Sequence, residues 1–398
     1  MYRRWLAILT YTAFTVCNSF QIPPKNTKGQ VTRRQLIIPD GEFFGSIAEK
    51  LAWPIGGIAA FRIGARIAVI GQPRLPNNCN GKDIGSRVIR TDKSGIRVRI
   101  FYPCKKPIQG TSYNIAPYCT DGRETSDGMA GLVGFRQLGI SFLLAHLAEA
   151  ESGCYENADI LEEEESSLPL LVYSHGYGGN MDMATYFLRT MASKGMIVAA
   201  IEHTDGTASS TILNDGTRLP FSPSLMNSKA SLNKRADEVI EVSNFISQKY
   251  KTNGLFYGGH SYGCPSAILA STRRMNGHLD GLILHDPALG MGYDLLPRSG
   301  QPDVPTVSYI SDEYNRGGVR YGDVTLHVRG AFHGNFVDAP LWAPSWVMRP
   351  LSAVIPACGP ADPVRVHDDL AISAKAFMTS KSVSGVIGVN QADLFEPV

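Results

Sequence analysis

The sequence LFYGGHSYGCPSAILAS, residues 255–271, decides the fold that we expect for this chain. Its centre, Gly259-His-Ser-Tyr-Gly263, is a GxSxG motif between a short apolar run and a run of helical character. In a strand–turn–helix of this kind, the serine lies on a sharp, strained turn with its hydroxyl exposed above the sheet. The glycines let strand and helix approach closely, and the helix N-terminus stabilises negative charge. We therefore predict that Ser261 is a nucleophile.

The segments around this motif alternate between strand-like and helix-like patterns. Residues 97–102 alternate polar and apolar side chains, as a half-buried strand does. Further β-rich runs lie at 170–173, 196–201, 255–257, 281–284, 306–310 and 324–328. Helical patterns lie between them at 183–193, 236–246 and 264–274, with Glu238, Glu241 and Lys249 on the other faces of the second. This order predicts a mostly parallel sheet with helices on both faces. With the GxSxG turn, it predicts the α/β-hydrolase fold.

A serine nucleophile needs an orienting acid, which in this fold follows the serine along the chain. Asp286 directly follows the strand-like run 281–284, where such an acid is expected. Asp280 precedes the same run and would lie at the opposite end of the strand, at the wrong end of the sheet for an acid that orients the base. A turn-forming role for Asp286 before Pro287 is the alternative.

The base is expected in a loop after the last strands. His333 lies in the sequence GAFHGNF, residues 330–336, just past the last strand-like run. A histidine between small residues in such a loop has access to a pocket, whereas His327 lies inside the strand and is expected to be structural. The predicted triad is therefore Ser261, Asp286 and His333.

An oxyanion hole needs a second backbone N–H beside the one that follows the nucleophile. The sequence SHGYGG, residues 174–179, follows a strand-like run and occupies the expected place. We predict that the backbone N–H groups of Tyr177 and Tyr262 form the hole. His175 is expected to brace this loop, and a role as the base is the alternative.

Composition limits the classes of partner. The chain has 398 residues, of which 43% are hydrophobic and 19% charged, as is ordinary for a globular protein. The net charge is +2, but the residues before Asp40 contain six basic side chains and no acidic one. The remainder of the chain is therefore mildly acidic. This argues against nucleic acid as a partner. There is no CxxC and no Cys/His cluster with metal-ligand spacing, so we predict neither a metal site nor a cofactor.

The N-terminal residues have the pattern of a targeting segment. Arg3 and Arg4 precede an apolar run, residues 5–16, which is too short to span a membrane comfortably. We predict a signal peptide at 1–19, followed by a basic, disordered or transit-like segment at 20–47. The expected location is the secretory pathway, with secretion. The alternative is a plastid, reached through a bipartite presequence.

We expect one catalytic domain from 48 to 380, with an insertion at about 103–167 and a C-terminal tail at 381–398. The insertion is rich in Gly, Ser and Thr and fits the strand–helix rhythm poorly, with one helix expected near 132–147. Four cysteines are expected either to form two disulfides in an oxidising compartment or to remain free thiols. They are Cys79, Cys104, Cys119 and Cys154.

Six segments occur in the order found in one enzyme family. They are RIFYP (99–103), LVYSHGYG (171–178), KGMIVAAIEH (194–203), GHSYG (259–263), SDEY (311–314) and GAFHGNF (330–336). Together they resemble the platelet-activating-factor acetylhydrolase family, or lipoprotein-associated phospholipase A2 group, over about 95–380. The combination of S-H-G, E-H and H-x-N-F is far more specific than GxSxG alone.

The resemblance implies a calcium-independent serine esterase that cleaves short or oxidised sn-2 acyl chains from phospholipids, with the triad named above. Two positions depart from the family: Ala288 stands where a tryptophan is usual, and Cys264 where a glycine is common. Both lie near the acyl pocket, so the acyl length stays open. One alternative is another carboxylesterase of this fold, chlorophyllase-like or dienelactone-hydrolase-like. The other is a non-catalytic lipid-binding module.

The resemblance also implies peripheral contact with a membrane or lipid particle. The matching stretches are 132–147 in the insertion and 340–351 after the predicted base. The side chains expected at the lipid surface are Phe135, Leu138, Phe142, Leu143, Trp342 and Trp346. The alternative is that they pack on the core.

Overall fold

A computed structural model describes residues 75–76, 81–105, 114–161, 168–274, 277–291, 293–296, 303–351, 358–387 and 394–398. The predicted signal peptide (1–19) and basic segment (20–47) lie outside these residues, so both stay predictions. Among the described residues, no helix is long and apolar enough to cross a membrane.

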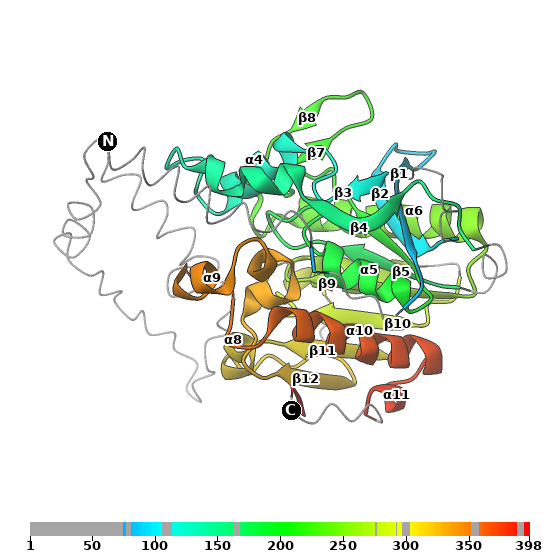
Figure 1. Cartoon of the computed structure of the whole chain (residues 1–398). Coiled ribbons are helices and arrows are strands. Elements are labelled where there is room, and N and C mark those ends of the chain that lie inside the picture. The colour runs from blue at the N-terminus through cyan, green and yellow to red at the C-terminus, as the bar shows by residue number, and fades with distance from the viewer. Residues whose placement is uncertain are drawn as a thin grey trace.

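One large sheet forms the centre of the molecule (Figure 1). Its strand order is β13-β12-β11-β10-β9-β5-β6-β2-β1-β4-β3. The bounds are β1 Ile84–Arg90, β2 Arg97–Pro103, β3 Ile115–Pro117, β4 Glu151–Glu156, β5 Pro169–Ser174, β6 Ile197–Ile201, β9 Gly254–His260, β10 Gly281–His285, β11 Thr306–Ile310, β12 Val324–Val328 and β13 Phe395–Pro397. The strands from β12 to β6 run parallel, whereas β2 pairs antiparallel with β6 and β13 antiparallel with β12. The predicted mostly parallel sheet is confirmed.

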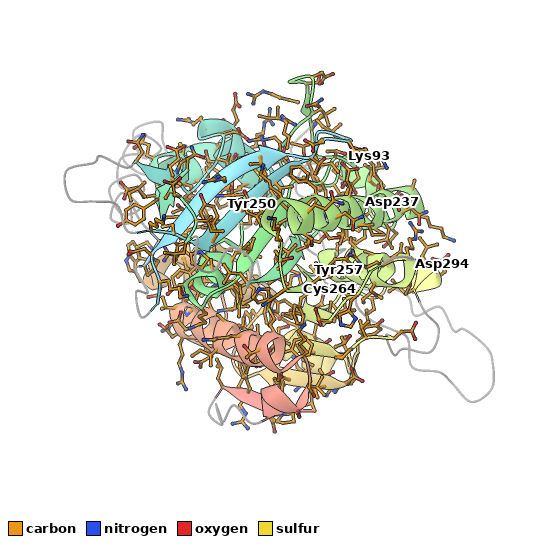
Figure 2. The ribbon with its side chains drawn as sticks, turned by 90° about the vertical axis from the view of Figure 1, so that its right-hand side faces the viewer. Lys93, Asp237, Tyr250, Tyr257, Cys264 and Asp294 are labelled. Carbon is orange, nitrogen blue, oxygen red and sulfur yellow. The ribbon has the colours of Figure 1, made fainter. Side chains whose placement is uncertain are left out.

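Helices cover both faces of this sheet. They are α4 Arg123–Leu132, α5 Thr185–Ser193, α6 Lys229–Tyr250, α7 Gly263–Arg273, α8 Asp312–Arg316, α9 Ser345–Leu351, α10 Pro363–Ser380 and α11 Ser384–Ile387. Short 3₁₀ helices are η1 Ser141–Glu149, η2 Pro223–Leu225, η3 Tyr293–Leu295, η4 His333–Phe336 and η5 Ala339–Leu341, and a small hairpin joins β7 Thr211–Ile212 to β8 Arg218–Leu219. Figure 1 shows α5 and α10 on the near face, and Figure 2 shows α6, marked by Asp237 and Tyr250, on the opposite side.

Side chains alternate between two buried layers along the central strands. On β5, Leu171 and Tyr173 pack in the cluster that contains α5 and α10, whereas Leu170 and Val172 pack in the cluster of α6 and α7. Because both faces of such a strand are covered, its sequence is a continuous apolar run. This is why the apolar runs predicted the central strands.

The predicted helix at 132–147 is wrong. The chain forms α4, which ends at Leu132, and then η1, which begins at Ser141. Gly134 and Gly139 lie between them with positive φ angles of 80° and 70°, a conformation that no continuous α-helix contains.

The edge of the sheet includes strands that the sequence did not predict. The expected insertion contributes β3 and β4, which extend the sheet beyond β1. The expected C-terminal tail contributes β13 at the other edge, so the fold continues past residue 380. Among the cysteines for which two disulfides were an alternative, Cys104, Cys119 and Cys154 are free thiols, and Cys79 lies outside the described residues.

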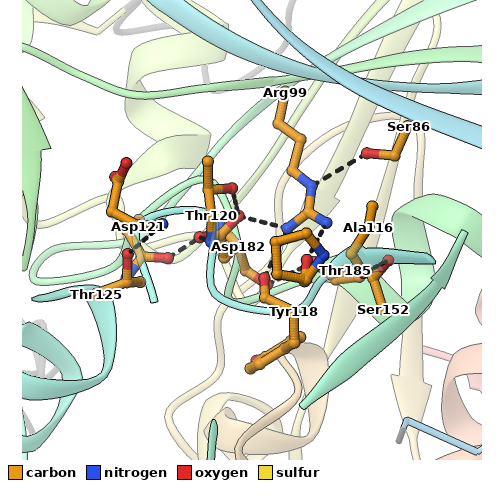
Figure 3. A network of polar contacts seen from close by, with 12 residues as sticks. Ser86, Arg99, Ala116, Tyr118, Thr120, Asp121, Thr125, Ser152, Asp182 and Thr185 are labelled. Atoms are coloured by element: carbon orange, nitrogen blue, oxygen red, sulfur yellow. Dashed lines mark hydrogen bonds and ion pairs between the residues drawn. The ribbon is translucent and has the colours of Figure 1, made fainter. Parts of the chain in front are cut away.

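A buried polar network around one ion pair fastens the insertion to the sheet (Figure 3). A guanidinium nitrogen of Arg99 on β2 lies 2.6 Å from a carboxylate oxygen of Asp182, in the segment before α5. The same guanidinium donates to the carbonyl oxygens of Pro117 and Tyr118, and Asp182 accepts the N–H of Thr120 at 2.8 Å. A buried charge is tolerated when its partners satisfy it in this way. The network therefore fixes the segment between β5 and α5, which carries the predicted oxyanion loop.

Candidate active site

Ser261 lies on a sharp turn between β9 and α7. Its φ angle is 55°, which places a non-glycine residue in the left-handed region at a cost of about 1–3 kcal/mol. Its N–H donates to the His285 carbonyl at 2.9 Å, and its carbonyl accepts the N–H groups of Cys264 at 3.1 Å and Ala288 at 3.2 Å. The turn is thus tied to the end of β10, which holds the strained conformation in place.

The two glycines of the GxSxG motif are required by close backbone contacts. A Cβ added at Gly259 would overlap the backbone of Gly263. A Cβ added at Gly263 would overlap the carbonyl group of Ser174 at the end of β5. Any other residue at either position would push β5, β9 and α7 apart and would move Ser261.

Asp286 and His333 are joined by a hydrogen bond, as the sequence predicts for an acid and its base. His333 Nδ1 lies 2.8 Å from one carboxylate oxygen of Asp286, and the other oxygen accepts the N–H of Ser311 at 2.6 Å. Asp286 is fully buried. With Nδ1 protonated toward the carboxylate, the Nε2 of His333 is an acceptor for a second proton.

The SDEY segment, residues 311–314, fixes the base from a second side. The Glu313 carboxylate accepts the backbone N–H of His333 at 3.0 Å, and the Tyr314 ring stacks on the His333 ring. Burial raises the pKa of Glu313. The sequence patterns predicted no role for the side chains of this segment. Its position directly after a strand end, like that of Asp286, was the available signal.

Two other histidines lie beside the candidate base. The ring centroid of His260 is 4.5 Å from that of His333, and its Nε2 lies 3.2 Å from the His333 carbonyl oxygen. Burial lowers the pKa of His260 well below its ordinary value and that of His285 to about 3. Both rings are therefore neutral near pH 7. His327 lies 2.8 Å from an Asp312 carboxylate oxygen, in keeping with the structural role expected for it.

The loop at 174–179 lies directly against the nucleophile. A Cβ added at Gly176 would lie 3.1 Å from the Cβ of Ser261. The rings of Tyr177 and Tyr262 meet edge to face, with centroids 5.9 Å apart. Within the described part of the chain, neither of these two backbone N–H groups donates to a protein acceptor. The two N–H groups predicted for an oxyanion hole therefore lie on adjacent segments and are available to a ligand.

His175, the second residue of this loop, is buried. The Nδ1 of His175 lies 2.8 Å from the Gly176 carbonyl oxygen, and the Arg235 guanidinium donates to the His175 carbonyl oxygen at 2.7 Å. Burial, together with the nearby Arg235 charge, lowers the pKa of His175 well below its ordinary value. These contacts agree with the bracing role expected for His175.

The two positions that depart from the family pattern are both buried. Cys264 donates its thiol to the carbonyl oxygens of Gly259 at 3.1 Å and His285 at 3.3 Å. Burial raises the pKa of this thiol well above its ordinary value. Ala288 packs in the cluster of α6 and α7. Cys264 therefore packs beneath the serine turn.

The side chains expected at a lipid surface divide into exposed and buried groups. Leu138 is 50% exposed and Trp346 is 65% exposed. Phe135, Phe142 and Leu143 are half-buried.

Trp342 does not belong to this surface, and its prediction is wrong. Its exposed fraction is 4%, and its indole N–H donates to the Tyr118 hydroxyl at 2.8 Å. Its carbonyl oxygen lies 2.7 Å from the Nε2 of His146, so the segment after the candidate base contacts η1.

Among the described residues, no group of three or more His, Cys, Asp or Glu side chains is arranged to hold a metal ion.

Comparisons with known proteins point to one family. Residues 67–244 match the family model described as platelet-activating factor acetylhydrolase, isoform II. A platelet-activating factor acetylhydrolase of Bos taurus is 27% identical over 146 residues, which are 36% of this chain and 31% of that protein. The Canis lupus familiaris protein is 28% identical over the same shares. The match thus spans about a third of the length of these relatives.

A solved structure with a similar fold is a ferulic acid esterase from Streptomyces cinnamoneus. It has a TM-score of 0.59 at 18% identity, and the alignment covers 78% of this chain and 93% of that one. This likeness shows the fold, which is the α/β-hydrolase fold.

Proposed function

We propose that this chain is a serine esterase of the platelet-activating factor acetylhydrolase family and that it acts on phospholipids, because residues 67–244 match the model of that family. We propose that it hydrolyses a short or oxidised acyl chain at the sn-2 position, without calcium, through an acyl-enzyme on Ser261. The observation that carries the proposal is the 2.8 Å contact between His333 and Asp286, in a loop that lies beside the strained Ser261 turn.

The first chemical step forms the acyl-enzyme. His333 Nε2 takes the proton from Ser261 as its oxygen attacks the ester carbonyl, and Asp286 keeps His333 in the tautomer that can accept this proton. The resulting imidazolium gives its proton to the leaving alcohol oxygen when the ester bond breaks. The strained turn and the contact with Asp286 keep both groups in place for this step.

The second step releases the acid. Water loses a proton to His333 and attacks the acyl carbonyl, and the proton then returns to Ser261 as the acyl–oxygen bond breaks. In both steps negative charge develops on the carbonyl oxygen. The backbone N–H groups of Tyr177 and Tyr262 stabilise it, and one such donor contributes on the order of 10²–10³ in kcat.

The phospholipid part of the proposal is supported by the family match and by the exposed Leu138 and Trp346. Large apolar side chains at a protein surface favour contact with a lipid interface. No step above requires a metal ion, so we propose that EDTA leaves the activity unchanged.

A phosphatidylcholine series tests the proposal. Substrates with sn-2 acetyl, oxidised short-chain and long-chain acyl groups are compared in EDTA, with Ser261→Ala as the control. We expect release of the short and oxidised chains and loss of activity in a folded Ser261→Ala protein. Cleavage of simple esters alone would favour the chlorophyllase-like or dienelactone-hydrolase-like alternative. Failure to react with a fluorophosphonate probe would favour the lipid-binding module.

A further inference from the structure

Helix α6 places two charged side chains beneath the loop at 174–179. Arg235 is fully buried and Glu238, one turn further along the helix, is 4% exposed. Burial of ionisable groups is costly unless hydrogen bonds and opposite charges satisfy them. The partners of these two side chains therefore indicate what the helix holds in place.

Glu238 is joined to the loop through a chain of hydrogen bonds. One of its carboxylate oxygens lies 2.6 Å from His203 Nδ1, and His203 Nε2 lies 2.7 Å from the Ser174 hydroxyl oxygen. The other carboxylate oxygen accepts the N–H of Thr204 at 3.1 Å. Burial, together with the nearby Arg235 charge, lowers the pKa of His203 well below its ordinary value. A neutral ring then donates from Nδ1 to Glu238 and accepts from Ser174 at Nε2.

This Ser174–His203–Glu238 chain has the atoms of a catalytic triad but not its accessibility. Ser174 and His203 are both fully buried, so no ester can reach the hydroxyl. Ser174 is the last residue of β5, and the chain turns directly from it into the loop that carries Tyr177. The hydrogen bond therefore fixes the start of the loop.

Arg235 contacts both halves of the candidate oxyanion hole. Its guanidinium donates to the His175 carbonyl oxygen at 2.7 Å and lies 4.8 Å from the centroid of the Tyr262 ring. A further nitrogen donates to an Asp205 carboxylate oxygen at 3.2 Å, which compensates its charge. One side chain thus bridges the loop before Tyr177 and the residue after the nucleophile.

We infer that α6 is the support of the oxyanion hole. Arg235, Glu238 and His203 are positioning residues that hold the Tyr177 and Tyr262 N–H groups where the transition state needs them. This inference rests on the proposed function. Oxyanion donors must lie about 2.7–3.1 Å from the oxygen that develops negative charge. A small displacement of the donors therefore weakens the stabilisation of the transition state more than the binding of the substrate. The ground-state ester carbonyl makes weaker contacts with these donors, so KM changes little.

The test compares Ser174→Ala and Glu238→Gln with a control on the same helix. Ser174→Ala removes the hydroxyl that is hydrogen-bonded to His203. Glu238→Gln places an amide NH₂ group opposite the Nδ1–H of His203, so that two donors face each other. The control is Ser243→Ala, which removes the 3.0 Å hydrogen bond of α6 to the Tyr257 hydroxyl and touches neither half of the hole. Tyr257 is labelled in Figure 2.

We expect kcat to fall about tenfold or more in Ser174→Ala and in Glu238→Gln while KM stays within about twofold. Affinity for a trifluoromethyl ketone, which forms a tetrahedral adduct with Ser261, should fall by the same factor as kcat. The double variant should lose little more than either single one, because both act through one chain of hydrogen bonds. Ser243→Ala should retain the wild-type kcat.

Unchanged kcat in folded Ser174→Ala and Glu238→Gln proteins would overturn the inference and leave the proposed function standing. A loss that also occurs in Ser243→Ala, in proportion to lost thermal stability, would overturn it as well. A wild-type protein that cleaves no ester and does not react with a fluorophosphonate would contradict the proposed function, and this inference with it.

Discussion

The Tyr314 ring lies flat against the His333 ring, with centroids 5.3 Å apart and 6° between the ring planes. Tyr314 is 3% exposed and is held at the start of α8 by the Ser311 hydroxyl, which accepts its N–H at 3.3 Å. In the proposed reaction His333 becomes positively charged after it takes the serine proton. The face of an aromatic ring attracts a cation, so the stack stabilises this charged state.

Replacing Tyr314 tests this stack. A cation–π contact contributes about 0.5–2 kcal/mol, so Tyr314→Leu should lower kcat about twofold to thirtyfold. Tyr314→Phe keeps the aromatic ring and removes only the hydroxyl group. The difference in kcat between the Leu and Phe variants therefore isolates the ring. Equal kcat values for the two variants would show that the ring has no such effect.

Asp286→Asn should leave the fold intact and lower kcat on the order of 10⁴-fold. One Asp286 oxygen is occupied by the Ser311 N–H, so the amide oxygen of an asparagine takes that place and its NH₂ group meets His333. His333 must then present an unprotonated Nδ1 and a protonated Nε2, which cannot accept the serine proton. Steady-state kinetics and thermal unfolding check both parts. Retention of more than about a tenth of wild-type kcat would contradict the assignment of the acid.

Asp338 should make the free energy of unfolding depend on pH. It is fully buried and accepts the N–H of Tyr186 with both oxygens, at 3.1 and 3.3 Å. Burial, offset in part by hydrogen bonds and the Arg189 charge, raises its pKa to about 8, whereas an unfolded aspartate has a pKa of about 3.9. The folded state thus binds more protons between about pH 4 and pH 8, so its stability falls as pH rises through this window.

Asp338→Asn carries no titrating group at this position. Urea unfolding at several pH values between about 4 and 8 should give a smaller loss of stability with rising pH than in the wild type. An identical slope in both proteins would place the pH dependence elsewhere. The N–H of Tyr186 retains an acceptor in the asparagine, so the start of α5 should remain intact.

Leu138 and Trp346 should contribute to binding of lipid vesicles. Burial of one large apolar side chain contributes about 1.5–3 kcal/mol, so replacing both by serine should lower vesicle affinity at least about tenfold. Ile372→Ser is the matched control, because Ile372 is 39% exposed on α10. Vesicle co-sedimentation measures the affinity, and hydrolysis of a water-soluble ester should stay unchanged. Equal losses in the control would show a general effect of surface apolarity.

The parts of the fold and site that the sequence predicted depend on local patterns. The central strands are covered on both faces, so their apolar runs were plain, and the turn at Ser261 follows from its two glycines. Asp286 and His333 were found because the fold fixes their order after the serine. Their direct contact in the structure agrees with that reasoning.

The parts that the sequence missed depend on partners far along the chain. Trp342 is buried because Tyr118 accepts its indole N–H, and no local pattern connects these two residues. Glu238 lies outside the apolar spacing of its helix, yet it is buried and its carboxylate contacts His203 and Thr204. The strand β4, with the sequence ESGCYE, is too polar to be recognised as part of a sheet edge.

The last strand, β13, has a consequence for the behaviour of the protein in solution. It pairs with β12, and the N–H of Arg329, just past β12, donates to the Leu394 carbonyl oxygen at 2.9 Å. A variant that lacks 394–398 would leave β12 as an open edge, with a row of unpaired N–H and C=O groups facing outward. Such an edge is a template for pairing with a second chain. Residues 394–398 thus protect against aggregation, because they cover β12, which ends a few residues before the loop that carries His333.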